Sequence, residues 1–204
     1  MKVTLTPHQA GWRDDFARHR GLIEKALADL GPVVEHIGST SLGDIAAKPI
    51  IDILVGLEAD LPLDAVVNPM LTAGYTYIAK FDAGMPYRRF FVELVPLRNA
   101  PLPTIIGDRD ELAFGRDYNS VTHIHVMTKG SYHWIRHIAF RDYLRAHPQI
   151  RKSYEALKLR IAQMDFNDPL EYNGHKESFI ATHQEKAVAW FARQHGIPVP
   201  EPAA

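Results

Sequence analysis

The chain has 204 residues and a formal net charge of −1, and its 46% apolar and 23% charged residues are typical of a globular protein. This balance argues against a broad basic surface for duplex nucleic acid, and the absence of cysteine excludes disulfides, thiolate chemistry and sulfur-ligated metal centres. No apolar stretch reaches the ~18 residues that a membrane span needs, and the first residues lack the apolar core of a signal peptide. We therefore expect a cytoplasmic protein without a membrane partner.

Hydrophobic periodicity predicts a mixed α/β pattern in the first two thirds of the chain. Apolar residues at helical spacing predict a first helix over 8–30, which Gly31 and Pro32 end. The strand over 50–57 is almost continuously apolar, which is typical of a central strand buried on both faces. A short helix is expected over 63–73, with a bend or break at Pro69. Strands are predicted at five places: 33–37, 50–57, 75–80, 88–95 and 122–128.

The rest of the chain is predicted to form a long loop and a helical portion. Residues 96–120 hold prolines, glycines and scattered charges, so we expect an excursion near the active face. Helical spacing begins at Tyr132, and three helices are expected before Gly196. We predict one domain over 1–196 of class α+β (mixed α/β), with helices flanking a mixed sheet and a helical portion over 131–196. A disordered, Pro-rich tail is expected over 197–204.

A glycine and three hydroxyl residues follow the first predicted strand: Gly38, Ser39, Thr40 and Ser41. Glycine lets the backbone bend tightly and approach a ligand closely. Unpaired backbone N–H groups at the start of a helix also attract phosphate. The same residues suit simple helix capping, because serine and threonine are common N-caps. The turn alone favours capping, so a role in phosphate binding depends on what lies beside it.

Asp52 is the one acidic residue in the apolar strand over 50–57. Burying a carboxylate is costly unless it is paired, hydrogen-bonded or bound to a metal. Asp52 could therefore hold Mg²⁺ in a cleft, or it could form a structural salt bridge with an arginine of the C-terminal helices. A Gly-Ser turn before an acidic strand suits metal-assisted phosphoryl transfer, in which the turn holds the phosphates and the acid holds the metal.

The segment EHIGSTSLGDIAAKPIIDILVGL, over 35–57, closely resembles the signature of the GrpB family. The later segments THIHVM, FRDYLRAHP, YEALK and KESFI resemble the same family in the same order, so the resemblance extends from about Pro7 to His195. By fold, that family belongs to the DNA polymerase beta-like nucleotidyltransferase superfamily. The resemblance implies a nucleotidyltransferase-like mixed sheet core flanked by helices, with a helical C-terminal third.

The resemblance also implies roles for individual residues. In the superfamily pattern, a Gly-Ser turn precedes an acid-x-acid pair on the next strand, and a third acid lies on a later strand. Gly38 and Ser39 match the turn and Asp52 matches the first acid, whereas Leu54 stands where the second acid is expected. Two-metal catalysis normally needs several clustered carboxylates. Either another residue fills the gap, or one metal suffices, or the chain does not catalyse.

Glu93 is the candidate third acid because its predicted strand is otherwise apolar on both sides, and Asp44 is a weaker candidate. Asp52 and Glu93 are thus the predicted metal ligands. Both are also predicted catalytic residues, together with His125. His123 and His125 are two apart on one strand and therefore share a face, where they can bind metal, bind phosphate or transfer protons, or simply meet water. A histidine-triad hydrolase would need a histidine at the position of Met127 and is rejected.

Several cationic side chains are candidates for phosphate binding. Lys48 precedes the acidic strand and could neutralise a phosphate as a compact charge, although a lysine before proline is usually solvated. Arginine forms bidentate pairs with phosphate oxygens, and the alternative for the C-terminal arginines is pairing with Asp142 or Glu155. His133 and His137 have the helical spacing of metal ligands, without the intervening glutamate of zincins. The predicted nucleotide-binding residues are Gly38, Ser39, Thr40, Ser41, Lys48, Arg89, His123 and Arg141.

The leading hypothesis is a nucleotidyltransferase that binds a nucleoside triphosphate with Mg²⁺ or Mn²⁺. It would transfer the nucleotidyl group to an unknown acceptor, with Ser39 and its neighbours on the β- and γ-phosphates. A catalytically silent nucleotide-binding or interaction module is the alternative, and Leu54 motivates it. A third hypothesis is a phosphohydrolase that uses the face of His123 and His125.

Overall fold

A computed structural model describes residues 3–99, 101–166, 171–199 and 201. The strands form one sheet in the order β1-β2-β5-β4-β3, in which β2 and β5 are parallel and all other neighbours are antiparallel. All five predicted strands are present. Their bounds are Val33–Ile37 for β1, Ile51–Leu57 for β2, Thr76–Tyr77 for β3, Arg89–Pro96 for β4 and Tyr118–Thr128 for β5.

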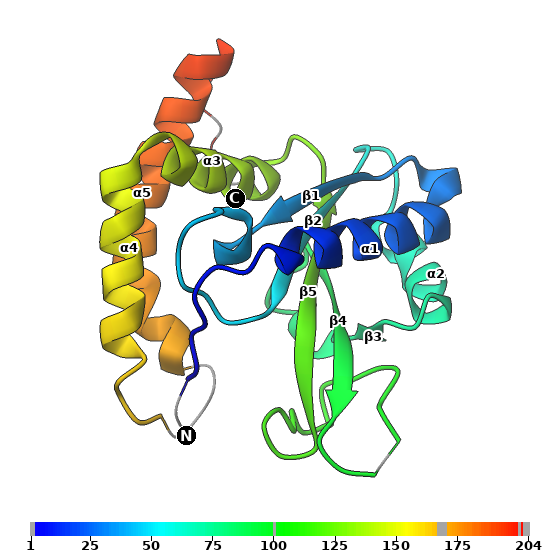
Figure 1. Ribbon diagram of the computed structural model, residues 1–204. Coiled ribbons are helices and arrows are strands. Elements are labelled where there is room, and N and C mark those ends of the chain that lie inside the picture. The colour runs from blue at the N-terminus through cyan, green and yellow to red at the C-terminus, as the bar shows by residue number, and fades with distance from the viewer. Residues whose placement is uncertain (1–2, 100, 167–170, 200, 202–204) are drawn as a thin grey trace.

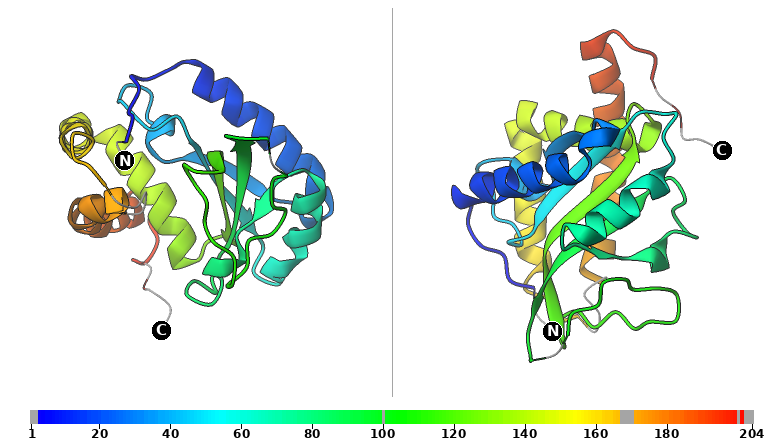
Figure 2. Two further views of the ribbon diagram at one scale, coloured as in Figure 1. Left: turned by 90° about the horizontal axis from the view of Figure 1, so that it is seen from below. Right: turned by 90° about the vertical axis from the view of Figure 1, so that its right-hand side faces the viewer.

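Helices cover both faces of the sheet (Figures 1 and 2). The helices α1 and α2 lie on one face, and α3 lies on the other and contacts β1, β2 and β5. The helices α4 and α5 run side by side and pack against α3 (Figure 1). The bounds are Gly11–Ala26 for α1, Val67–Thr72 for α2, Tyr132–Ala146 for α3, Pro148–Ile161 for α4 and Glu171–His195 for α5. The mixed α+β class and the helical C-terminal third are therefore confirmed.

The largest apolar core lies between the sheet and α1. Strand residues that alternate along β2, β4 and β5 point to this face, as the pairing of Ile53 with Ile124 illustrates. Each fully buried branched side chain contributes about 1.5–3 kcal/mol to stability. The buried residues of this core include Trp12, Ile23, Leu27, Ile51, Ile53, Val55, Phe91, Ile124 and Val126.

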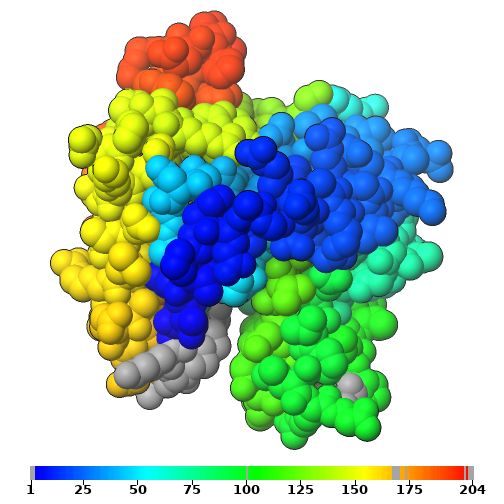
Figure 3. Space-filling model, viewed as in Figure 1, coloured from blue at the N-terminus to red at the C-terminus, as the bar shows by residue number. Residues whose placement is uncertain are grey.

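The opposite face of the sheet has two differently covered regions. At the middle of β2, Leu54 is fully buried against Ile37, Met127 and Trp134 of α3. Farther toward the start of β2, Asp52 is only partly buried. The N-terminal segment reaches this region, since Thr6 pairs with Ala47. Figure 3 shows the segment, in dark blue, beside α4 in yellow.

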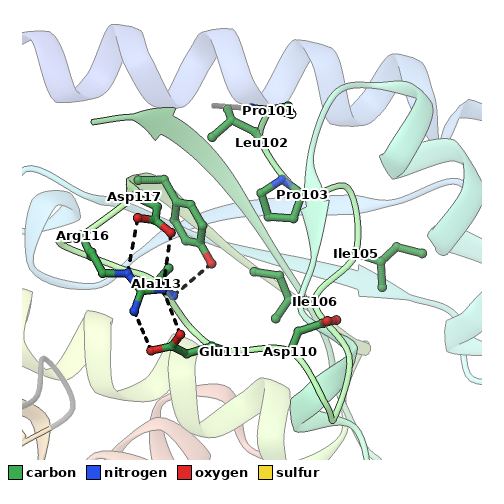
Figure 4. Close-up of a pocket in the computed structure, with 11 residues that line it drawn as sticks. Pro101, Leu102, Pro103, Ile105, Ile106, Asp110, Glu111, Ala113, Arg116 and Asp117 are labelled. Carbon is green, nitrogen blue, oxygen red and sulfur yellow. Dashed lines mark hydrogen bonds and ion pairs between the residues drawn. The ribbon is translucent and has the colours of Figure 1, made fainter. Parts of the chain in front are cut away.

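The loop between β4 and β5 packs on the same sheet face as Asp52. Ile106, Ala113 and Tyr118 cover Val92 and Leu94 of β4. The loop and the first residue of β5 line a cavity of about 310 Å³, where Arg116 pairs with Glu111 and Asp117 (Figure 4). None of the predicted site residues lines this cavity.

The observed helix bounds differ from the predicted ones at two places. The first helix is shorter than 8–30, because its last apolar residues continue in a 3-10 turn over Ala28–Leu30 that Gly31, with φ 55°, ends. Over 63–73, a 3-10 turn precedes α2. Pro69 lies in the first turn of α2, where its missing N–H breaks no helical hydrogen bond.

Two further expectations meet the structure only in part. Of the predicted tail over 197–204, the structure describes 197–199 and 201, and the other residues lie outside the described part of the chain. Among the helices that the structure describes, none combines the length and apolarity required to cross a bilayer.

Candidate anion-binding site

The site begins where β1 turns into the next segment beside β2. Ile37, the last residue of β1, pairs with Asp52 of β2, so Gly38 lies directly next to the acid. Gly38 has φ 69°, and a Cβ placed on it would lie 2.8 Å from both Cβ and Cγ of Asp52. A side chain at position 38 would thus have to displace the carboxylate. Glycine is required here both for its backbone conformation and for the close approach of Asp52.

The hydroxyl groups of the turn are used mainly within the turn. Ser41 donates to the carbonyl of Gly38 at 2.7 Å, and the buried Thr40 hydroxyl lies 3.0 Å from Nε2 of His36. Burial raises the pKa of Tyr154 of α4 to about 12, and the nearby Ser39 hydroxyl opposes that shift. Thr40 and Ser41 therefore hold the local structure, whereas Ser39 points toward the C-terminal helices.

Three lysines interact electrostatically with Asp52, and we call Lys48, Lys158 and Lys176 the lysine cluster. Lys158 of α4 is 2% exposed, and its ammonium donates to the carbonyl of Ala46 at 2.5 Å. The ammonium groups of Lys48 and Lys176 lie over the ring of Tyr172, at 4.1 and 4.4 Å from its centroid. Four separate parts of the chain thus meet here: β2, the segment before it, α4 and α5.

Burial and mutual repulsion alter the protonation of the cluster. Burial lowers the pKa of Lys158 and of Lys176 to about 8, and in each case a neighbouring lysine lowers it further. The charge of Asp52 opposes both shifts, and that of Glu155 also opposes the shift of Lys158. Burial also lowers the pKa of Lys48, again opposed by Asp52. All three ammonium groups therefore interact with Asp52, and Glu155 adds a second carboxylate at Lys158, which still leaves one positive charge uncompensated. Such an arrangement favours an oxyanion ligand.

Sequence reasoning identified Lys48 but missed Lys158 and Lys176. Both lie in segments that resemble the GrpB family, YEALK and KESFI, so the resemblance contained the signal. From the helical pattern alone, a buried lysine cannot be told apart from a solvated one. Only the packing of α4 and α5 beside the first residues of β2 brings these side chains to Asp52.

His123 is the predicted site residue that lies beside Asp52. Its Nδ1 is 3.4 Å from Oδ1 of Asp52, and its Nε2 is 2.9 Å from the hydroxyl of Ser120. Ser120 shares this face because the register shifts between Glu93 and Leu94, which leaves one extra residue in β5. Sequence alternation could not have revealed this contact, since residues three apart on a regular strand face opposite sides.

The structure places Glu93 away from Asp52, which corrects the predicted metal pair. Glu93 pairs with Thr122, and Thr122 pairs with Ile51, so all three point to the α1 face. The Glu93 carboxylate lies 3.2 Å from Arg18 and 3.3 Å from His19 of α1. Because strand side chains alternate, Asp52 and Glu93 occupy opposite faces of the sheet and cannot share a metal ion.

Arg89 and Arg141 also have structural partners rather than positions beside Asp52. Arg89 lies on the α1 face and donates to Asp64 at 2.5 Å. Arg141 donates to Glu35 at 2.6 Å and to Asp142 at 2.8 Å, beside a cavity of about 380 Å³ at the edge strand β1. The alternative interpretation, in which Arg141 pairs with Asp142, therefore describes the structure better than phosphate binding does.

The remaining candidates lie farther from the lysine cluster. Asp44 pairs with Arg151 of α4 at 2.7 Å. His125 accepts a hydrogen bond from Arg88 at 3.2 Å instead of contacting Asp52. His133 stacks on Tyr87, with ring centroids 3.4 Å apart. Of the predicted residues, the structure thus brings together Gly38, Ser39, Lys48, Asp52 and His123.

The donor set around Asp52 does not fit a two-metal centre. Leu54, at the position of the expected second acid, is fully buried against Trp134. Within the described ranges, no three histidine, aspartate or glutamate side chains are grouped so that they could hold a metal. Mg²⁺ is often bound by one or two carboxylates together with substrate phosphates. The single carboxylate of Asp52 fits that mode only.

Fold and site together define an α+β protein with a cluster of lysines around one strand acid. The chain belongs to the GrpB family, because the family model described as GrpB protein matches residues 2–186.

Relatives of known sequence and structure agree with this membership. The chain is similar to the glutamate-rich protein GrpB of Alkalihalophilus pseudofirmus, with 31% identity over 183 residues that cover 88% of this chain and 92% of the relative. It is 30% identical over 190 residues to the UPF0157 protein YqkA of Bacillus subtilis, covering 93% of this chain and 48% of that protein. The crystal structure of GrpB from Enterococcus faecalis matches with a TM-score of 0.72 and 28% identity, over 92% of this chain and 99% of that one.

Proposed function

We propose that this GrpB protein binds a nucleoside triphosphate through the lysine cluster and acts as a nucleotidyltransferase. The convergence of Lys48, Lys158 and Lys176 on Asp52 carries the proposal, because three ammonium groups exceed what the two carboxylates that act on them, those of Asp52 and Glu155, can neutralise. A triphosphate supplies the missing negative charge. The resemblance of the turn and the acidic strand to the nucleotidyltransferase superfamily supports the reaction type.

Each residue of the site has a distinct role in this proposal. Lys48 and Lys176 are partly exposed and contact the β- and γ-phosphates directly. Lys158 is buried, so it fixes the segment of Ala46 and adds long-range positive charge. Gly38 leaves room for the carboxylate of Asp52 at the α-phosphate. His123, between Asp52 and Ser120, is placed to accept the proton of an acceptor hydroxyl.

A divalent cation would complete the charge balance at Asp52. A single Mg²⁺ or Mn²⁺, shared between Asp52 and the phosphates, would supply Lewis-acid stabilisation of the reacting phosphoryl group. The lysines of the protein neutralise the phosphate charge, so no second metal ion is needed for that role. This division of roles accommodates the buried Leu54.

The same buried leucine supports a second candidate function, a catalytically silent nucleotide-binding module. With Leu54 packed against Trp134, the second carboxylate of the superfamily pattern has no equivalent among the described residues. The two functions share the binding step and differ in turnover. Release of pyrophosphate from ATP or GTP across a panel of hydroxyl acceptors identifies the transferase, and binding without release identifies the silent module.

Calorimetry with a non-hydrolysable ATP analogue tests the binding step. We expect Lys176→Gln to weaken binding at least tenfold, because it removes a charge that touches the phosphates. Lys152→Gln is the matched control, since Lys152 is an exposed lysine of the same helical portion. We expect it to bind within twofold of the wild type. Equal affinities of the two variants would overturn the proposal.

Asp52→Asn gives a second, opposite-signed test in the same assay. Without a divalent cation, the variant should bind the analogue more tightly, because a negative charge has left the phosphate site. With Mg²⁺, it should bind more weakly, because the carboxylate no longer shares the cation. If the affinity of the variant depends on Mg²⁺ in the same way as that of the wild type, Asp52 is not part of the nucleotide site.

A further inference from the structure

A second group of basic side chains lies on the same sheet face, and we call Arg88, His125, Arg136 and His137 the arginine–histidine cluster. Arg88 donates to Nδ1 of His125 at 3.2 Å and lies over the ring of Phe90, 4.8 Å from its centroid. The rings of His125 and His137 are 5.7 Å apart. The cluster joins the end of the β3–β4 connection, β5 and α3, and the function proposed above does not use it.

The two arginines of this cluster differ from the other partly buried arginines. Arg89, Arg141 and Arg151 each lie within ion-pair distance of a carboxylate. Within the described part of the chain, Arg88 and Arg136 have no such partner. Their charges also repel each other: burial lowers the pKa of Arg88, and the charge of Arg136 lowers it further, opposed by Tyr87 and Asp82. Partly buried cations without an ion-pair partner lose hydration without regaining it from a carboxylate, which costs stability.

The histidines between these arginines are held in the neutral state. Burial lowers the pKa of His125 well below its usual value, and the charges of Arg88, His137, His123 and Arg136 lower it further. Burial lowers the pKa of His137 to about 3, assisted by Arg136, Arg88 and His133. Because the guanidinium of Arg88 donates to Nδ1 of His125, that ring must accept there and can donate from Nε2.

Two polar atoms at the cluster are buried without a hydrogen-bond partner among the described residues. They are Nε of Arg136 and Nδ1 of His133. Native proteins pair nearly all buried polar atoms, so each exception calls for a ligand, an ion or water. A metal ion is disfavoured beside two guanidinium groups. An oxyanion, in contrast, would accept from both arginines and from the imidazoles.

We propose that the arginine–histidine cluster is a second oxyanion site, which binds a phosphate group of the acceptor substrate. The ring of Phe90 links it to the first site, since its centroid lies 5.5 Å from that of His123 and 4.9 Å from that of His125. The acceptor phosphate and the nucleotide would thus bind along one face of β5, on either side of His123. The assignment to the acceptor rests on the proposed function, whereas the oxyanion site itself does not.

Inorganic phosphate and nitrogen NMR of the histidine rings test the site directly. Signals of His125 and His137 are assigned with the variants His125→Gln and His137→Gln. Saturating phosphate should raise the apparent pKa of at least one of the two rings by one unit or more, because the bound anion offsets the arginine charges. If neither ring responds to phosphate, the proposal is overturned.

The variants Arg136→Gln and Arg88→Gln show whether the response arises in this cluster. Each should weaken phosphate binding, read at the histidine signals, at least tenfold, while Arg160→Gln on the exposed side of α4 should stay within twofold. Circular dichroism melts show whether each variant is folded. If one arginine variant does not fold, the other still tests the site. If Arg136→Gln and Arg88→Gln both match Arg160→Gln, the cluster is not the site.

Repeating the phosphate titration with a saturating ATP analogue tests the link to the acceptor. Simultaneous binding, with the phosphate affinity changed by less than threefold, supports an acceptor site separate from the nucleotide. Competitive displacement of phosphate overturns the acceptor assignment. If the analogue does not bind at all, the proposed function fails, while the phosphate response of the histidines still decides whether the oxyanion site exists.

Discussion

The carboxylate of Asp52 lies in the space that a side chain at Gly38 would occupy. A Cβ on Gly38 would be 2.8 Å from Cγ of Asp52, far inside van der Waals contact. Pairing of β1 with β2 creates this contact, because Ile37 and Asp52 are register partners. The turn at Gly38 and the carboxylate of Asp52 are therefore one structural unit, so a substitution at either position should change the conformation of the other.

Substitution of Gly38 should disrupt the site more than substitution of a comparable glycine. Gly43 is the matched control: it also has a positive φ, 89°, but a Cβ there would meet nothing within 4 Å. We expect Gly43→Ala to cost about 1–2 kcal/mol of backbone strain and to leave nucleotide affinity unchanged. Gly38→Ala should cost more and weaken Mg²⁺-dependent binding at least tenfold. Urea unfolding measures the stability of each variant, and calorimetry measures its nucleotide affinity. Equal nucleotide affinity of the two variants would contradict the coupling of Gly38 to Asp52.

Restoring the second acid at Leu54 should unfold the protein rather than repair a metal site. Leu54 is fully buried among Ile37, Met127 and Trp134. A carboxylate there has no partner, so Leu54→Asp should lower the free energy of unfolding by about 3–5 kcal/mol. The control Leu54→Met should cost less than about 1.5 kcal/mol. A Leu54→Asp protein as stable in urea as Leu54→Met would show that this position can hold a second acid after all.

Removal of the Glu93 charge should leave the nucleotide site intact. Glu93 faces α1, where it lies near Arg18 and the buried His19. We expect Glu93→Gln to bind the ATP analogue within twofold of the wild type, with a stability loss of about 1 kcal/mol or less for this partly exposed pair. Asp52→Asn, tested beside it, should alter the Mg²⁺ dependence. Loss of Mg²⁺-dependent binding in Glu93→Gln would contradict the placement of Glu93 and Asp52 on opposite faces of the sheet.

Local sequence patterns predicted the elements of this fold well, for identifiable reasons. Strand and helix periods are set by which residues face the core, so the strand at 51–57 and the helix at 132–146 could be located from apolar spacing. Boundaries were less accurate, as the 3-10 turns after α1 and before α2 illustrate. Such turns depend on the last few hydrogen bonds rather than on the apolar pattern.

Apart from His123, the site could be predicted only where its residues are close in the sequence. Gly38 directly follows β1 and Asp52 lies on the adjacent β2, so their proximity followed from a local motif. Glu93 was assigned to the wrong face, because alternation along one strand does not tell which face of the sheet a side chain occupies until the register with the neighbouring strands is known. Lys158 and Lys176 were missed because their approach to Asp52 depends on how α4 and α5 pack, which no local pattern encodes.

The lysine cluster predicts that anion binding and stability change in opposite directions with pH. The folded-state pKa of Lys158 and of Lys176, about 8, lies below the ~10.4 of an unfolded chain. Between these values the unfolded state binds more protons, so the free energy of unfolding should rise as the pH increases from about 8 to 10. Over the same range the lysines lose their charge, so the affinity for the ATP analogue should fall. Denaturation and calorimetry at pH 7, 8 and 9 measure the two trends, and a constant affinity from pH 7 to 9 would contradict the role of these lysines.

Removing one lysine should therefore stabilise the protein while it weakens binding. At pH 7, Lys176 is charged although burial and the nearby Lys48 both oppose that charge. Lys176→Met keeps a long apolar side chain against Tyr172 and removes the repulsion, so we expect the melting temperature to rise by about 2–4 °C, the change that 1 kcal/mol produces in a protein of this size. Lys152→Met on the exposed side of α4 controls for the general effect of losing a lysine and should change the melting temperature by less. A lower melting temperature for Lys176→Met than for Lys152→Met would mean that the contact between Lys176 and Tyr172 outweighs the repulsion, so that the cluster is a stabilising feature of the fold and not a strained site that an anion relieves.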